Sequence, residues 1–125
     1  MENSFHLSLA VKEYLTSKRF YGEILGGIVE RETETWFNVN LYGHQVTLHE
    51  APEKIIKNDY FHWGINLDWK DFFDLYDRLK DSTRFKLQPE IQDEGEPQER
   101  VKMIFHDPND YLLEFKAYKN KVDQF

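Results

Sequence analysis

An internal repeat constrains this chain more than any other feature of its sequence. The segment FHLSLAV at residues 5–11 is echoed by FHWGINL at residues 61–67. Apolar residues alternate with period two in both segments, which is the pattern of a β-strand with one buried face. His6 and His62 occupy equivalent positions on the opposite, polar face. The repeat therefore predicts two similar modules, each beginning with a strand that carries a histidine.

A helical pattern and then three strand-like segments follow each copy of the repeat. Large apolar residues recur three to four positions apart in residues 11–27 and again in residues 69–82, which favours one amphipathic helix per module. The strand-like segments are residues 26–31, 35–43, 44–50, 84–91, 100–107 and 111–118. We therefore predict an α+β protein with two tandem β-α-β-β-β modules in a single domain, residues 1–125. Module 1 covers about residues 4–50, the linker about 51–59, and module 2 about 60–119.

Charge and cysteine content exclude several classes of function. The formal net charge is -7 and the sequence contains no block of Lys or Arg, so no nucleic-acid partner is expected. No apolar run is long enough to cross a bilayer, so we expect no membrane partner and a cytoplasmic location. The absence of cysteine excludes disulfides, thiolate ligands and iron–sulfur clusters. Any metal must be held by nitrogen and oxygen.

Glu114 stands out because it interrupts the otherwise apolar run YLLEFKAY at residues 111–118. Alternation places Tyr111, Leu113, Phe115 and Ala117 on one face, toward a helix, and Glu114 on the other face. A glutamate on such a face is usually solvated surface. It is also a suitable anionic ligand beside two histidines, so the residues alone leave both interpretations open.

The order and spacing of FHLSLAV, FYGEILGG, GHQVTLHE, FHWGINLD and DPNDYLLEF resemble the vicinal oxygen chelate superfamily. This superfamily includes glyoxalase I, extradiol dioxygenases and the fosfomycin and bleomycin resistance proteins, and the resemblance covers nearly the whole chain. The small predicted extradiol-type dioxygenases are most similar. The resemblance implies a curved mixed sheet around a concave cavity for a metal and a small-molecule substrate. It also implies a homodimer.

The resemblance implies a metal site made of His6, His62 and Glu114. Its members place ligands on the first strand of each module and on the last strand of the second module. Two histidines and one carboxylate suit a divalent metal with open positions, Fe(II) first, with Mn, Ni and Zn as alternatives. We therefore expect a dioxygenase-like enzyme that cleaves a small vicinal dioxygenated aromatic. The alternatives are a non-catalytic binding protein of the bleomycin-resistance kind and a Lewis-acid glyoxalase or lyase.

Departures from the family pattern narrow these alternatives. Glyoxalase I usually has a fourth protein ligand on the last strand of the first module, where this chain has Thr47, so a three-ligand site is favoured. The tyrosine expected in a fosfomycin-type enzyme is replaced by Ile104, and no cationic substrate-binding group is evident in the sequence. A fosfomycin-type enzyme is accordingly a minor alternative.

Further residues are candidates for catalysis or for the wall of the cavity. His49, His106 and Tyr118 are candidate proton-transfer groups by composition. His49 lies two residues beyond Thr47 on the same face, and Tyr118 shares the face of Glu114. His49 is equally compatible with an ordinary exposed histidine, and His106 with a histidine that stabilises a turn. The acidic segment 92–100 is a solvated loop or a lid. The predicted cavity residues are Ser8, Trp36, Asn38, Thr47, Gly64 and Asn66.

Overall fold

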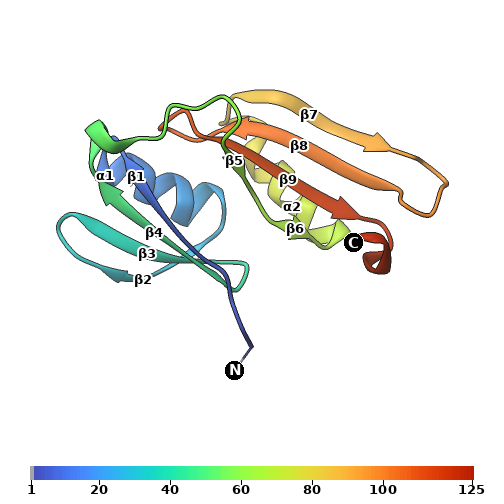
Figure 1. Ribbon diagram of the computed structural model, residues 1–125, viewed down its shortest axis with the longest axis horizontal. Helices are drawn as coiled ribbons and strands as arrows, with labels where there is room; N and C mark the ends of the chain where they lie inside the picture. Colours follow the sequence, from blue (N-terminus) through green and yellow to red (C-terminus); the bar gives the residue numbers. More distant parts are fainter. Residues whose placement is uncertain (1) are drawn as a thin grey trace. The chain divides into compact units, whose positions relative to one another are not determined.

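The computed structural model describes residues 2–125, which form two compact units. The first unit ends at Lys57 and the second begins at Asn58. Each unit has its own mixed β-sheet and a helical segment (Figure 1). The predicted α+β class with two β-α-β-β-β modules is confirmed. No helix in the described part of the chain is long and apolar enough to span a membrane.

The first unit places one helical segment against a four-stranded sheet. Its elements are β1 (His6–Val11), α1 (Tyr14–Arg19), the π-helical turn η1 (Phe20–Ile24), β2 (Ile28–Glu32), β3 (Trp36–Leu41), β4 (His44–Glu50) and the 3-10 turn η2 (Pro52–Lys54). The strand order is β1-β4-β3-β2, with β1 parallel to β4 and the other pairs antiparallel. The Glu50 carboxylate on β4 accepts a hydrogen bond of 2.8 Å from the Tyr14 backbone N–H and so caps α1.

The second unit repeats this topology with one longer helix. Its elements are β5 (His62–Trp63), β6 (Asn66–Leu67), α2 (Trp69–Leu79), β7 (Phe85–Gln92), β8 (Arg100–His106), β9 (Leu112–Tyr118) and the 3-10 turn η3 (Lys121–Asp123). The strand order is β5-β9-β8-β7, and β6 also pairs with β9. Both β5 and β6 run parallel to β9, as β1 runs parallel to β4. The sequence repeat therefore corresponds to a repeat of sheet topology.

Two local elements differ from the sequence-based prediction. The strand expected over residues 61–67 is divided into β5 and β6, because the backbone at Gly64 lies against the carbonyl of Glu114 and interrupts the ladder. The first helix changes to a π-helical turn at Phe20, where the N–H of Leu25 bonds to the Phe20 carbonyl at 2.8 Å. Neither change alters the strand order.

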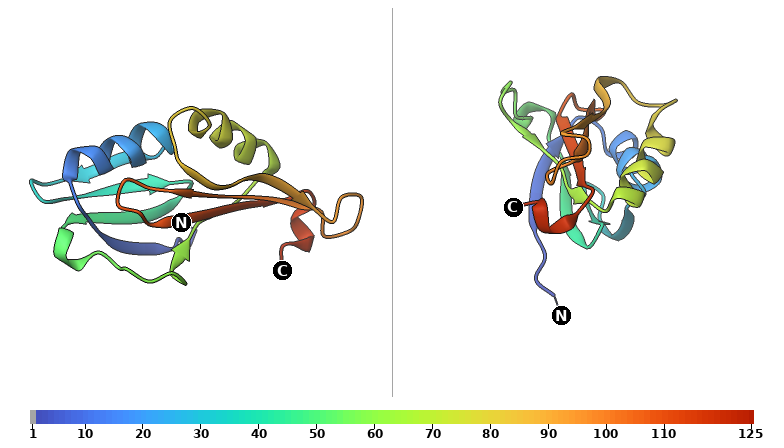
Figure 2. Two further views of the ribbon diagram at one scale, coloured as in Figure 1. Left: turned by 90° about the horizontal axis from the view of Figure 1, so that it is seen from above. Right: turned by 90° about the vertical axis from the view of Figure 1, so that its right-hand side faces the viewer.

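Alternating burial defines one apolar and one polar face in each sheet. In β3 the side chains of Phe37, Val39 and Leu41 are buried, and those between them are half-exposed. In the second unit α2 contributes buried Phe72, Leu75 and Leu79 to the core, and it covers one face of the sheet (Figure 2). The β-strands of that unit bury Leu67, Val101, Met103, Phe105, Leu113, Phe115 and Ala117. The opposite, polar faces carry the candidate site residues.

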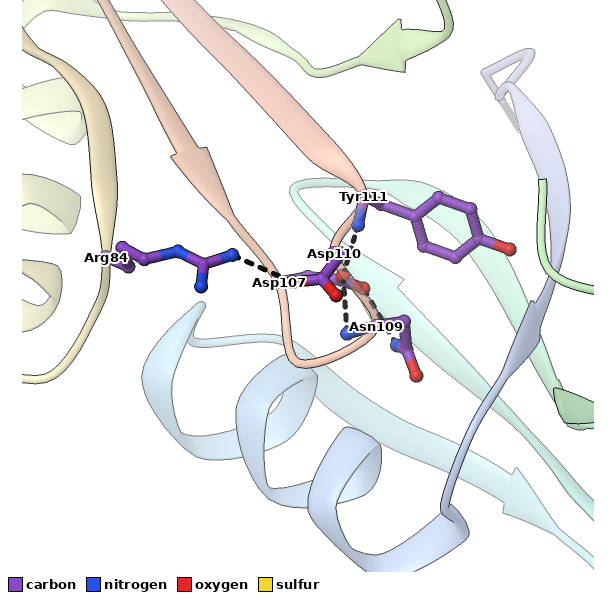
Figure 3. A network of polar contacts seen from close by, with 5 residues as sticks. All are labelled: Arg84, Asp107, Asn109, Asp110 and Tyr111. Carbon is purple, nitrogen blue, oxygen red and sulfur yellow. Dashed lines mark hydrogen bonds and ion pairs between the residues drawn. The ribbon is translucent and has the colours of Figure 1, made fainter. Parts of the chain in front are cut away.

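A tight turn between β8 and β9 sets the start of the strand that carries Glu114 (Figure 3). The buried Asp107 carboxylate accepts hydrogen bonds of 2.8 Å from the backbone N–H groups of Asn109 and Tyr111. Asp110 has a positive φ of 68° and its carboxylate lies 2.8 Å from Arg84. The carboxylate of Asp107 therefore replaces the backbone acceptors that these N–H groups lack in the turn.

Candidate functional site

The polar face of the second sheet carries Glu114 in a half-buried position. In β9, Leu113 and Phe115 are fully buried, whereas Glu114 between them projects to the opposite face. The predicted alternation of this strand is thus confirmed. Its side chain is 21% exposed, so Glu114 is more enclosed than an ordinary surface carboxylate. On β8 it lies directly opposite Ile104, an aliphatic residue that offers it no hydrogen bond.

His62 lies beside Glu114 because β5 runs parallel to the strand that carries the carboxylate. His62 is the register partner of Leu112, two residues before Glu114. Its Nε2 atom is 3.6 Å from Oε2 of Glu114, which is longer than a hydrogen bond. The structure therefore brings together two of the three predicted metal ligands within one unit.

A hydrogen bond on the far side of the ring fixes the tautomer of His62. Its Nδ1 atom lies 3.1 Å from the carbonyl oxygen of Tyr60. A carbonyl oxygen only accepts hydrogen bonds, so Nδ1 must carry the proton. In the neutral ring, Nε2 then presents a lone pair toward the Glu114 carboxylate. A backbone carbonyl that orients a histidine in this way is a common second partner of metal-binding histidines.

The separation of these two atoms fits a bound divalent cation. A metal bonded to both at about 2.1 Å would hold them about 3.0 Å apart in octahedral geometry and about 3.4 Å apart in tetrahedral geometry. The observed 3.6 Å is about 0.2 Å longer than the tetrahedral value and about 0.6 Å longer than the octahedral one. One imidazole nitrogen and one carboxylate oxygen are also donors suited to Fe, Mn, Ni or Zn. The residues present therefore fit two positions of a metal site.

Gly64 allows the chain between β5 and β6 to lie close to the backbone of β9 at Glu114. A Cβ atom added at Gly64 would lie 1.7 Å from the carbonyl oxygen of Glu114 and 3.1 Å from a ring carbon of Phe115. Glycine is thus required for the backbone between His62 and Asn66 to pass against β9. Asn66 pairs in parallel register with Lys116, the next residue on the Glu114 face. The predicted cavity residue Gly64 acts here through its backbone.

The first unit carries the other predicted residues on the polar face of its own sheet. His6 pairs with Gln45, and Ser8 pairs with Thr47. Thr47 lies two residues after Gln45, the partner of His6, just as Glu114 lies two residues after Leu112, the partner of His62. Thr47 and Glu114 therefore occupy equivalent positions in the two units. Its hydroxyl donates a hydrogen bond of 2.6 Å to Asn38 Oδ1. Thr47 is thus engaged with a neighbouring strand and only 8% exposed.

Trp36 and His49 form an aromatic cluster on the same face of the first sheet. They are register partners on β3 and β4, and their ring centroids are 6.2 Å apart. The guanidinium of Arg31 lies over the Trp36 ring at 5.6 Å. Ser8 and His49 also line an open surface cavity of about 390 Å³. His49 is exposed, so a place for it in a binding surface stays a prediction.

Tyr118 shares the face of Glu114, but it lies four residues further along β9. This is about 13 Å at the rise of a β-strand. The role of Tyr118 in proton transfer stays a prediction. His6, Ser8, Asn38 and the Trp36 cluster belong to the first unit. That these residues form one site with His62 and Glu114 stays a prediction. Within each unit, residues 2–125 include no group of three His, Asp or Glu side chains arranged for a metal.

Two features of the second sheet, the burial of His106 and the pairing of two lysines, were not predicted from the sequence. His106 is half-buried, and its Nδ1 atom is buried without a hydrogen-bond partner among the described residues. Burial lowers the pKa of His106, and the nearby Arg84 guanidinium lowers it further. Lys102 and Lys116 are cross-strand partners on the Glu114 face. The alternation of β8 and β9 could have indicated their shared face, but their pairing needs the register.

Comparisons with known proteins identify the family. Residues 4–115 match the model of the Glyoxalase/Bleomycin resistance protein/Dioxygenase superfamily. The chain is 34% identical over 82 residues to the metallothiol transferase FosB of Staphylococcus haemolyticus. That match covers 62% of this chain and 58% of the relative, so the chain spans well under two thirds of the curated relative's length.

Two solved structures resemble this chain over nearly its full length. The glyoxalase/bleomycin resistance protein/dioxygenase of Alicyclobacillus acidocaldarius has a TM-score of 0.81 at 25% identity, with 98% of this chain and 96% of that chain covered. The fosfomycin resistance protein FosX of Listeria monocytogenes has a TM-score of 0.77 at 15% identity, with 98% of both chains covered. At 15% identity, the similarity to FosX shows a shared fold only.

Proposed function

The chain belongs to the Glyoxalase/Bleomycin resistance protein/Dioxygenase superfamily, and we propose that it is a divalent-metal enzyme acting on a small oxygen-chelating substrate. In this proposal His6, His62 and Glu114 hold the metal. The observation that carries it is the approach of His62 Nε2 to Glu114 Oε2, which are 3.6 Å apart with no hydrogen bond between them. A cation between the two atoms would satisfy both.

Lewis-acid chemistry is the best supported reaction type. A bound divalent metal supplies polarisation of a substrate oxygen without redox change. A staphylococcal relative is named as a metallothiol transferase, which supports group transfer more than ring cleavage. The proposed reaction is therefore addition of a thiol or of water to an electrophilic carbon of a small substrate. This reverses the order of the sequence-based hypotheses, which put the Fe(II) dioxygenase first.

The chain's own residues have distinct parts in this proposal. The Tyr60 carbonyl keeps the proton of His62 on Nδ1, so that Nε2 stays available as a donor. Gly64 lets β5 and β6 approach β9 closely and fixes the backbone of Glu114. Ile104 and Leu112 are half-buried aliphatic neighbours of Glu114 that would limit access of water. His49 and Tyr118 remain predicted proton-transfer residues.

Metal binding tests this proposal directly. We expect wild-type protein to bind one Mn²⁺ per chain in calorimetric titration. Replacing a metal ligand should weaken Mn²⁺ binding by more than about 100-fold. Loss of a residue that only orients a metal ligand already weakens binding by up to about 100-fold. The variants are His6→Ala, His62→Ala and Glu114→Gln. Glu90→Gln is the matched control, because it removes an exposed carboxylate from β7 of the same sheet. Equal Mn²⁺ affinity in Glu114→Gln and wild type would show that the metal is held elsewhere.

An Fe(II)-dependent extradiol dioxygenase is the second candidate. The proposed donor set of two imidazoles and one carboxylate favours it, because this set is typical of non-haem Fe(II) oxygenases. Oxygen uptake by anaerobically Fe(II)-loaded protein with a panel of catechols separates the two reactions. We expect no catechol-dependent uptake, and a ring-cleaved product would reverse the ranking. Tight binding of a small molecule without turnover would indicate the bleomycin-resistance type of protein instead. A cytoplasmic location and a homodimer stay predictions from the sequence.

A further inference from the structure

Two lysines face each other across β8 and β9 on the polar face of the second sheet. Lys102 and Lys116 are direct register partners, and both are half-buried. Side chains in such pairs have Cβ atoms about 4.5–5.5 Å apart, and like charges there are destabilising. This repulsion between two lysines is unusual in a chain of net charge -7, because such a chain has more carboxylates than it needs to pair with its lysines.

Neither ammonium group has an ion-pair or hydrogen-bond partner among residues 2–125. Several other lysines of the second unit do have such partners; for example, Lys70 lies 2.7 Å from Asp74, and Lys119 lies 3.3 Å from Glu99. Glu90 is the register partner of Lys102 on β7, but its carboxylate accepts a hydrogen bond from Gln92 instead.

The lysine pair lies next to the proposed metal ligands. Lys116 follows Glu114 by two residues on the same face of β9, a rise of about 7 Å. Lys102 likewise stands two residues before Ile104, the partner of Glu114. Two long, flexible cationic side chains therefore border the position where His62 and Glu114 would hold a ligand.

We propose that Lys102 and Lys116 bind an anionic group, a carboxylate or a phosphoryl group, of the substrate that the metal site holds. The inference rests on the proposed function, because it places the anion on the same molecule. An anion between the two ammonium groups removes their repulsion and gains attraction to both. The acidic remainder of the chain repels anions, so a local cationic pair gives the site selectivity for them.

Anion binding can be measured without metal or activity. We expect methylphosphonate and acetate, added at constant ionic strength, to cause saturable shifts of the backbone amides around Lys102 and Lys116 in ¹⁵N NMR spectra of the metal-free protein. The double variant Lys102→Gln/Lys116→Gln should bind at least about tenfold more weakly, because both cations are lost. It should fold with a Tm at or above that of wild type, since repulsion is relieved. A stronger response to methylphosphonate indicates a phosphoryl group, and a stronger response to acetate indicates a carboxylate.

Lys70→Gln is the matched control, because it removes one positive charge from the same unit on α2. It should leave anion affinity unchanged. Shifts that do not saturate, or that are equal in wild type and the double variant, would overturn the proposal. Mn²⁺ titration of the same samples separates the two hypotheses. Anion binding that is retained in a protein without metal affinity rejects the metal site alone, and normal Mn²⁺ binding without anion binding rejects the lysine subsite alone.

Discussion

At the scale of single residues, the candidate site combines one side chain that a hydrogen bond orients with one that is largely enclosed. The Nδ1 atom of His62 is committed to the Tyr60 carbonyl, and the Glu114 carboxylate is 21% exposed. A donor whose orientation is already fixed loses little entropy on binding a ligand. This preorganisation distinguishes His62 from an ordinary exposed histidine, although its side chain is 53% exposed.

Gly64 gives a test of how closely the backbone must pass Glu114. We expect Gly64→Ala to lower the free energy of unfolding by about 1–3 kcal/mol or more, because the new Cβ overlaps a backbone carbonyl that cannot rotate away. Urea denaturation measures this, and Mn²⁺ affinity should fall with it. Gly22→Ala is the control, since its Cβ would meet only a side-chain methyl of Val29 at 3.3 Å. Equal stability of the two variants would contradict the close approach.

His106 predicts how stability depends on pH. Burial lowers its pKa in the folded state, whereas the unfolded imidazole protonates near pH ~6.5. Between these two values the unfolded state binds more protons, so the free energy of unfolding falls as the pH drops below about 6.5. We expect His106→Gln to show a flatter decline between about pH 6.5 and 5 in urea titrations. Parallel curves for variant and wild type would argue against a buried neutral histidine.

At the scale of elements, the turn between β8 and β9 supports the strand that carries Glu114. Asp107→Ala removes the acceptor for two backbone N–H groups, which we expect to cost about 2–4 kcal/mol of unfolding free energy. Asp110→Asn weakens the exposed ion pair with Arg84 and should cost less than about 1 kcal/mol. Asparagine also tolerates the positive φ at this position. Thermal or urea unfolding measures both, and similar losses would show that the carboxylate of Asp107 has no special part.

The acidic segment after β7, residues 92–100, contains both exposed acidic residues and one buried glutamate. Most of residues 92–98 are exposed, as a solvated loop predicts. Glu99 is only 8% exposed, because its carboxylate accepts hydrogen bonds from Gly95 N–H and from Lys119. These bonds, led by the Gly95 N–H, lower the pKa of Glu99. The loop is thus tied to the residue that follows β9.

At the scale of the whole molecule, the two units share one topology but differ in their polar faces. The first offers Thr47 bonded to Asn38 where the second offers Glu114. We expect the protein to be a homodimer in solution, with a mass about twice the 15.1 kDa of one chain in light scattering. A mass of one chain at micromolar concentration would reject this expectation.

The sequence by itself determined the class of the fold, the two modules and the face on which each strand residue lies. Alternation and helical spacing are local properties, so the sequence pattern alone assigns Glu114 to the polar face and Leu113 and Phe115 to the core. The family resemblance, carried by residues at known spacing, agrees with the matched family model. The set of His6, His62 and Glu114 stays a prediction from that resemblance.

Only the tertiary structure decided which residues lie opposite one another. The 3.6 Å approach of His62 to Glu114, the bond from His62 to Tyr60 and the close passage of Gly64 depend on the parallel pairing of β5 with β9. The same is true of Lys102 and Lys116, which are far apart in sequence and adjacent only through the register of β8 and β9. A one-residue change of register would move every such partner to another face, and local sequence patterns do not specify that choice.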